Sequence, residues 1–196
     1  AQNAALLLAG RDIHLTTTTQ SSASQVGANR FAQTGIDRVA SLHVSGPAGV
    51  LIASAGRDLN LTAAQLQNSG TGPTVLSAGN NLSLNTVNTA ASQNIVWDSK
   101  NHLSQSASQD VGSQISAGGA LSLSAGNDIS ARAASVQAAG ALSATAGRNI
   151  TLTTGQASQS LDEAHQHSSS GFLSSSTRTC SPSADWPAML RRSVSQ

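Results

Sequence analysis

The sequence predicts an all-β protein, a right-handed parallel β-helix (β-solenoid) with about 21–23 residues per coil. Three observations predict it: a heptapeptide that returns in phase, an apolar-polar alternation beside each copy, and a composition poor in aromatic rings and in charge. Repetition at a fixed period is the signature of proteins that stack one structural unit. Right-handedness is expected because crossover connections between parallel strands are right-handed.

The heptapeptide begins with Ala-Gly, continues with two residues drawn from Arg, Asn and Asp, and ends on an apolar-polar-apolar step. Its copies start at Ala9, Ala55, Ala78, Ala125 and Ala146, so the intervals between them are 46, 23, 47 and 21 residues. Helical repeats need roughly 33–47 residues per unit, whereas short strands between tight turns fit the shorter step. At this step the 196 residues are expected to form about eight coils.

The second and fourth positions of the heptapeptide are the predicted corner of each coil. Glycine accepts a positive φ without penalty, and Asn and Asp tolerate it while hydrogen-bonding their own backbone. The corner residues are Gly10, Asp12, Gly56, Asp58, Gly79, Asn81, Gly126, Asp128, Gly147 and Asn149. Because the acidic residues recur at a turn, backbone bonding explains them better than catalysis.

The residues that follow each corner alternate, as in Leu59-Asn60-Leu61 and Leu82-Ser83-Leu84. Alternation with a period of two buries one face of a strand and leaves the other in solvent. Stacking at about 4.8 Å then places Leu and Ile in an internal ladder. A thin solenoid has no thick core for bulky rings, which fits a content of 2% aromatic and 10% charged residues.

Polar stretches interrupt the plain coils from about Gln20 to Thr34, from about Asn88 to Gln114 and from Gly155 on. Each follows an Ala-Gly copy and a Thr- or Asn-rich strand, so we expect plain coils to alternate with elaborated coils. The third stretch contains Asp162, Glu163, His165 and His167. These residue types bind zinc, but no third cluster stands at ligand spacing. A solvated polar loop is therefore favoured, with no metal and no other cofactor.

The composition and motifs disfavour several other functions. A net charge of +1 with scattered charges lacks the basic stripe of a nucleic-acid surface. The Gly-x-Ser-x-Gly elbow of a hydrolytic triad and tandem calcium-binding nonapeptides are both missing from the sequence. A β-helical polysaccharide-degrading enzyme, with acidic side chains from successive coils in a groove, stays open as an alternative. A passive structural spacer is a second alternative.

The segment from Ala146 to Ser160, followed by the His-bearing stretch and Gly171-Phe172-Leu173-Ser174, resembles the haemagglutinin repeats of filamentous-haemagglutinin-type exoproteins. The resemblance covers about Ala4 to Thr179. The mixture of plain and elaborated coils is most similar to the second repeat region of contact-dependent growth-inhibition exoproteins. In this resemblance the polar loop corresponds to His165, His167, Gly171 and Phe172.

The resemblance implies a non-catalytic filament segment that is secreted to the cell surface of a Gram-negative bacterium by two-partner secretion. Its implied partners are an outer-membrane secretion partner and the surface or outer membrane of a target cell, where the segment mediates contact and supports toxin delivery. Flat strands with little charge also favour edge-to-edge self-association.

Residues 1–179 are predicted to be the haemagglutinin-repeat β-helix, and residues 180–196 a separate tail. The tail abandons the repeat, and Pro182 and Pro187 oppose strand pairing, so disorder or a short helix over 188–192 is expected. The chain also begins in mid-pattern. We therefore expect an internal fragment of a longer rod, and a frameshifted or truncated gene end is one expectation for the change of character after Thr179.

Overall fold

The computed structural model describes residues 2–171 and 174–180, with side chains up to residue 166. All regular structure in these residues is β-strand, and three of the sheets consist of stacked parallel strands. The predicted all-β solenoid class is thereby confirmed. The chain divides into a coil unit (Ala1–Thr19, Ile36–Val87 and Asp110–Gly155) and an arm unit (Gln20–Gly35, Asn88–Gln109 and the residues from Gln156 on).

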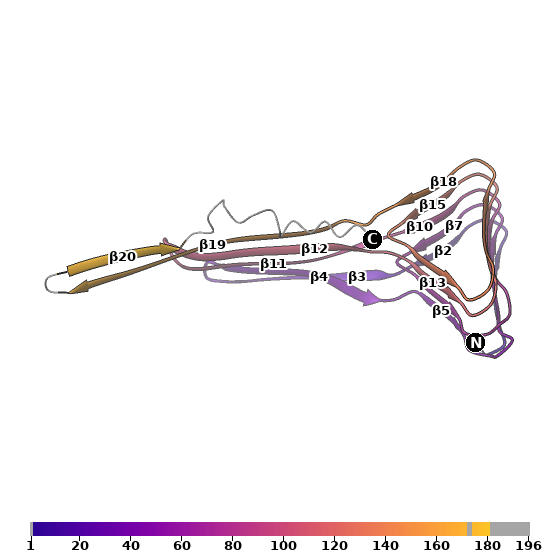
Figure 1. The fold of residues 1–196 in the computed structure, drawn as a ribbon, viewed down its shortest axis with the longest axis horizontal. Coiled ribbons are helices and arrows are strands. Elements are labelled where there is room, and N and C mark those ends of the chain that lie inside the picture. Colours follow the sequence, from indigo (N-terminus) through magenta and orange to yellow (C-terminus); the bar gives the residue numbers. More distant parts are fainter. Residues whose placement is uncertain (1, 172–173, 181–196) are drawn as a thin grey trace. The chain divides into compact units, whose positions relative to one another are not determined.

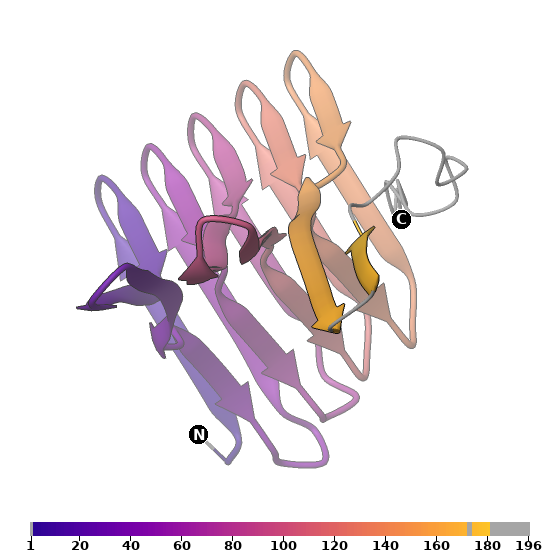
Figure 2. The same cartoon turned by 90° about the vertical axis from the view of Figure 1, so that its left-hand side faces the viewer.

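The coil unit is built from three parallel sheets, to which successive coils contribute neighbouring strands (Figures 1 and 2). Sheet 1 contains β1 (Ala4–Ala9), β6 (Val50–Ala55), β9 (Thr74–Ala78), β14 (Leu121–Ala125) and β17 (Leu142–Ala146). Sheet 2 contains β2 (Ile13–Thr16), β7 (Leu59–Thr62), β10 (Leu82–Asn85), β15 (Ile129–Arg132) and β18 (Ile150–Thr153). Sheet 3 contains β5 (Ser41–Val44), β8 (Gln65–Asn68), β13 (Gln114–Ala117) and β16 (Ser135–Ala138).

Equivalent residues of the repeat lie beside one another in the sheets. In sheet 2 the ladder runs through Ile13, Leu59, Leu82, Ile129 and Ile150, at sequence intervals of 46, 23, 47 and 21 residues. The described residues thus form five coils in sheets 1 and 2. The expectation of about eight coils was wrong, because the additional residues of the long intervals leave the stack as hairpins.

The interior of the coil unit is the predicted ladder of aliphatic side chains. Leu59, Leu61, Leu82 and Leu84 are at most 1% exposed, while the residues between them point outward. The pattern changes in β18, where Leu152 is 75% exposed. This strand ends the order of sheet 2, so only one neighbouring coil covers its inward face.

The corner glycines lie in the bends between sheets 1 and 2, but the expected reason for them was wrong. Among the described glycines only Gly27 has a positive φ. The corners instead pack backbone on backbone. A Cβ on Gly79 would collide with the carbonyl oxygen of Gly56, and a Cβ on Gly126 with that of Gly79. Close approach of two chains, which only glycine permits, therefore explains the repeated residue.

Plain and elaborated coils differ at the corner between sheets 2 and 3. Two residues close the corner in the plain coils, Ala63–Ala64 and Ala133–Ala134, and the first of each pair has a φ of 47°. In the elaborated coils the same place holds residues 17–40, residues 86–113 and the residues from 154 on. The polar stretches in the sequence are thus insertions at one structural position.

Buried hydroxyl groups close the coil unit where an insertion begins or ends. Thr17 Oγ1 donates a hydrogen bond to the Ala63 carbonyl at 2.6 Å and accepts one from the Ala40 N–H at 3.1 Å. Ser113 Oγ donates to the Leu61 carbonyl at 3.0 Å and accepts from the Ala64 N–H. Each hydroxyl satisfies backbone groups that would otherwise be buried without a partner.

Each insertion is an antiparallel hairpin, which we call an arm, and the arms together form the arm sheet. Its strand order is β20-β19-β12-β11-β4-β3. The strands are β3 (Thr18–Val26), β4 (Asn29–Arg38), β11 (Val87–Asp98), β12 (Asn101–Val111), β19 (Ala157–Gly171) and β20 (Ser174–Cys180). Residues 181–196 lie outside the described residues, and with them most of the predicted tail and its expected disorder or helix.

Because plain and elaborated coils alternate, the distance between successive elaborated coils equals the width of one arm. Arms leave the first, third and fifth coils. Two coils advance by about 9.6 Å, twice the strand spacing of about 4.8 Å, and one two-stranded arm also occupies two strand spacings. One plain coil between arms is therefore what allows neighbouring arms to form a continuous sheet.

We expect the coil unit to fold without its arms. An armless variant replaces residues 17–40 and 86–113 by Ala-Ala, the corner of the plain coils, and ends at Gly155. The aliphatic ladder remains complete in this variant, and the arms add none of the most deeply buried aliphatic side chains. Circular dichroism should show β-structure that unfolds in one transition. A polypeptide without cooperative unfolding would mean that the coils depend on the arms.

Candidate functional surface

The predicted corner acids form a ladder of contacts between coils. Asp12 accepts hydrogen bonds from the Arg57 guanidinium at 2.8 and 3.2 Å and from the Asp58 N–H at 3.2 Å. Asp128 Oδ2 lies 2.6 Å from Arg148 Nη2 in the next coil. Asp58 in turn accepts hydrogen bonds from the side-chain amides of Asn80 and Asn81 in the next coil at 2.9 and 3.1 Å. These carboxylates are engaged in joining coils.

The Asp12 carboxylate is held in its charged form by this contact. The hydrogen bond from Arg57 is the main cause that lowers the pKa of Asp12 below its ordinary value. Because the pKa is lower in the folded chain, the contact stabilises the fold above the unfolded pKa. That stabilisation is lost as the pH falls through the folded pKa.

We expect Arg57→Ala to raise the pKa of Asp12 toward its ordinary value, as measured by NMR titration of the carboxyl carbon. Arg11→Ala is the control, because Arg11 lowers this pKa only through space and is the weakest of the causes. Arg11→Ala should therefore shift the pKa less. Equal shifts in the two variants would mean that general charge, and not the hydrogen bond, sets the titration.

The predicted polar loop lies in the arm sheet and is a strand. His165 Nε2 lies 3.8 Å from Glu163 Oε2, and its ring centroid lies 5.8 Å from that of Trp97 on β11. His102 Nε2 lies 3.7 Å from Asp162. His167 and Gly171 belong to β19, the side chain of His167 lies outside the described side chains, and Phe172 lies outside the described residues.

These side chains do not converge as metal ligands. Among the described residues no group of three or more His, Cys, Asp or Glu side chains is placed to hold a metal ion. The His and acidic residues meet in pairs, on opposite faces of the arm sheet. The expectation that this stretch binds no metal stays a prediction.

The first two arms have different turns. Gly27, with a φ of 60°, begins the two-residue turn Gly27–Ala28 between β3 and β4, where glycine meets the need for a positive φ. In the second arm, Asp98 accepts hydrogen bonds at 2.7 Å from the Lys100 N–H and the Asn101 side chain. These contacts lower the pKa of Asp98, the Asn101 bond most strongly.

Strand pairing assigns each side chain to a face of the arm sheet, because directly opposed residues point the same way. One row crosses four strands, β4, β11, β12 and β19. Phe31 is opposite Gln93, the Gln93 side chain donates to Gln105 at 3.1 Å, and Gln105 is opposite Leu161. Residues two positions along each strand share the face of this row.

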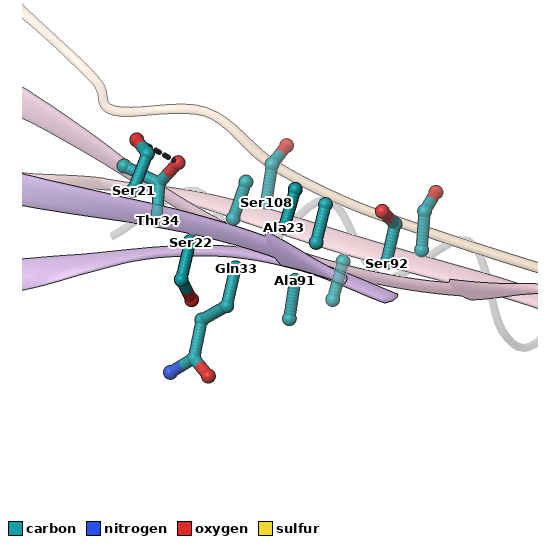
Figure 3. Close-up of a pocket in the computed structure, with 12 residues that line it drawn as sticks. Ser21, Ser22, Ala23, Gln33, Thr34, Ala91, Ser92 and Ser108 are labelled. Atoms are coloured by element: carbon teal, nitrogen blue, oxygen red, sulfur yellow. Dashed lines mark hydrogen bonds between the residues drawn. The ribbon is translucent and has the colours of Figure 1, made fainter. Parts of the chain in front are cut away.

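One face of the arm sheet, the hydroxyl face, carries pairs of hydroxyl side chains that are joined across neighbouring strands. Ser21 and Thr34 are joined at 2.8 Å, and the pairs Ser106–Ser160 and Ser108–Ser158 at 2.7 Å. Figure 3 shows Ser21, Thr34 and Ser108 on one side of the strands, with Gln33 and Ala91 on the other. A shallow hollow over these strands is lined mainly by Ala and Ser.

The opposite side, the apolar face, carries most of the large apolar side chains of the arm unit that the structure describes. Its apolar members are Val26, Phe31, Ile95, Trp97, Leu103 and Leu161. Val26 is 70% exposed, Leu161 58% and Trp97 57%. This surface was not predicted from the sequence. Alternation within the arms was its only signal, and reading it requires the position of each turn.

Residues 96–182 match the family model of the hemagglutinin repeat. The match begins in β11 of the second arm, passes through the fourth coil and continues through the third arm. It supports the predicted resemblance and a filamentous-haemagglutinin-like adhesin segment.

Further comparisons add no relative. Neither a curated protein nor a solved structure matches the chain. The match of residues 96–182 to the hemagglutinin-repeat model is therefore what these comparisons contribute. Within the described residues, no helix has the length and hydropathy needed to cross a membrane.

Proposed function

We propose that this chain is a segment of a secreted surface filament that acts as an adhesin and has no catalytic residues of its own. The observation that carries the proposal is the match of residues 96–182 to the hemagglutinin repeat, which covers the later part of the second arm, the fourth coil and the third arm. Stacked coils supply a long scaffold, and the arms present polar and apolar side chains to the surroundings.

The environment of the corner acids supports a non-catalytic role. A polysaccharide-degrading enzyme of this fold class needs free acidic groups in a groove. In this chain Asp12, Asp58 and Asp128 accept hydrogen bonds from the following coil. Their oxygens are used in the contacts that hold the stack in register.

The resemblance to the second repeat region of contact-dependent growth-inhibition exoproteins makes the proposal more specific. The parent protein is a Gram-negative exoprotein of the contact-dependent growth-inhibition type, exported by an outer-membrane secretion partner. Its second repeat region supports toxin delivery at the surface or outer membrane of a target cell. The alternation of plain coils with polar arms is the feature on which this assignment depends.

Edge-to-edge contacts are also part of the proposal. In the arm unit, β3 ends the strand order, and the exposed residues Gln20–Val26 contain no charge and no proline. Charged residues and proline are the usual protection of a sheet edge. An added strand from the secretion partner, the target surface or another copy of the chain would pair along this edge.

Cell binding by the purified chain tests the proposal. The fluorescently labelled chain should bind Gram-negative cells saturably, and unlabelled chain should compete. The armless variant is the matched control and should lose this binding if the arms provide the contact. A chain that binds no cells would assign the segment to a passive spacer, and release of reducing ends from surface polysaccharide would assign it to an enzyme.

A further inference from the structure

The apolar face of the arm sheet lacks a second layer. Sheets with an apolar face are stable when that face packs against another element. Within the described residues of the arm unit, all strands belong to one sheet. Among the described side chains of the arm unit, five large apolar ones are exposed, and four of them, Val26, Phe31, Trp97 and Leu161, point to the same side. Such clustering indicates a surface that is covered in the working protein.

We infer that the apolar face is a self-association surface on which a second copy of this chain packs, sheet against sheet, about a two-fold axis. Two sheets packed face to face lie about 10 Å apart, with interdigitating side chains. The two-fold arrangement is isologous, so the same residues meet on both copies. The inference does not depend on the proposed cell contact.

The few charges on the apolar face allow it to pack against the same face of a second copy. In its described part there is no Lys or Arg. Its carboxylates are Glu163, beside His165 at 3.8 Å, and Asp37 near the end of β4. Two such faces therefore meet without strong like-charge repulsion. A surface without cations is poorly suited to anionic ligands such as nucleic acid, sulfated glycans or anionic lipid headgroups.

The amide groups on the face are partly satisfied before any partner arrives. Gln93 donates to Gln105 at 3.1 Å in the middle of the row between Phe31 and Leu161. Burying a polar group is costly chiefly when it loses its hydrogen bonds. This internal pair reduces the cost of covering the centre of the face with another apolar surface.

The area of the face is sufficient. Five strands (β3, β4, β11, β12 and β19) carry it. At about 4.8 Å per strand and roughly eight residues of 3.3 Å each, the footprint is on the order of 600 Å² per copy. Two copies would together bury on the order of 1,200 Å², the lower limit of stable interfaces. A concentration-dependent dimer is therefore expected.

Analytical ultracentrifugation of the full chain over a concentration series tests the inference. Trp97→Ser and Leu161→Ser should each raise the dimer dissociation constant at least about tenfold, because each change removes an apolar side chain from both copies. Val96→Ser is the matched control. Val96 is the neighbour of Trp97, is 37% exposed, and points to the hydroxyl face. It should leave the dissociation constant unchanged.

Cysteine cross-linking in a Cys180→Ser background locates the contact. Gln105→Cys, exposed near the centre of the apolar face, should give disulfide-linked dimers on mild oxidation. Ser106→Cys, equally exposed on the other face, should not. A strictly monomeric chain would overturn the inference and assign the cover to another ligand or to residues 181–196. The inference would also be overturned, in favour of another surface, by a dimer whose dissociation constant is unchanged by Trp97→Ser and Leu161→Ser. Disulfide cross-linking through Ser106→Cys would overturn it in the same way.

Discussion

Gly79→Ala is expected to destabilise the coil unit by about 3 kcal/mol, although it adds a single methyl group. The new Cβ would collide with the Gly56 carbonyl oxygen. That oxygen belongs to a backbone tied into the stack, since the Gly56 N–H bonds to Ala9 and the Gly79 N–H to Ala55. The backbone at Gly56 cannot move away from the new methyl group without breaking these hydrogen bonds. The measurement is the urea midpoint of unfolding.

The chain supplies its own control for this substitution. Gly10 occupies the same position of the heptapeptide, but a Cβ there has nothing within 4 Å because no described coil precedes it. Gly10→Ala should therefore change stability by no more than about 0.5 kcal/mol. If both alanine variants lose stability equally, backbone conformation and not close approach explains the repeated glycine.

The corners show what the sequence can predict about this fold. The positions of Gly56 and Gly79 follow from the period of the repeat, and so does the alternation that buries Leu59 and Leu82. The reason for the glycines does not follow from the sequence. Glycine is the residue expected both where φ is positive and where two backbones approach closely. Only the distance to the next coil distinguishes the two reasons.

The arms show where prediction from the sequence ends. Their approximate limits, such as Gln20 to Thr34, are visible as polar interruptions, and the arm unit begins at the same residue. Their hairpin form was not predicted, and the interruptions were counted as coils. Ser- and Gln-rich strands lack the apolar alternation that distinguishes a strand inside the stack from one outside it.

The candidate surface required the structure because it depends on register. A shift of one residue in a hairpin moves every side chain to the other face. The first arm turns at Gly27–Ala28 and the second around Asp98–Lys100, and these turns decide that Phe31 and Trp97 share a face. The predicted His165 lies beside Trp97. The predicted polar loop therefore lies in the region of the candidate surface, but its apolar character was not predicted.

Deleting one plain coil is expected to disrupt strand pairing in the arm sheet more than deleting a plain coil together with an elaborated one. Removal of residues 59–81 joins Asp58 to Leu82 and preserves the aliphatic ladder, because Leu59 and Leu82 are register equivalents. It also leaves the first two arms attached to adjacent coils. The attachments are then about 4.8 Å apart, whereas a two-stranded arm needs about 9.6 Å. The pairing of β4 with β11 should be lost.

Removal of residues 59–128 is the matched control, because it joins Asp58 to Ile129 and retains one plain coil between the remaining arms. In this variant β19 takes the place of β11 beside β4. Amide hydrogen exchange should show protected β4 and β19 after the larger deletion and exchanging β4 and β11 after the smaller one. Equal protection of the arms in both variants would mean that the arms pair without regard to the spacing of the coils that carry them. Loss of the arms only in the smaller deletion would show that the alternation of plain and elaborated coils sets the spacing of the arm sheet.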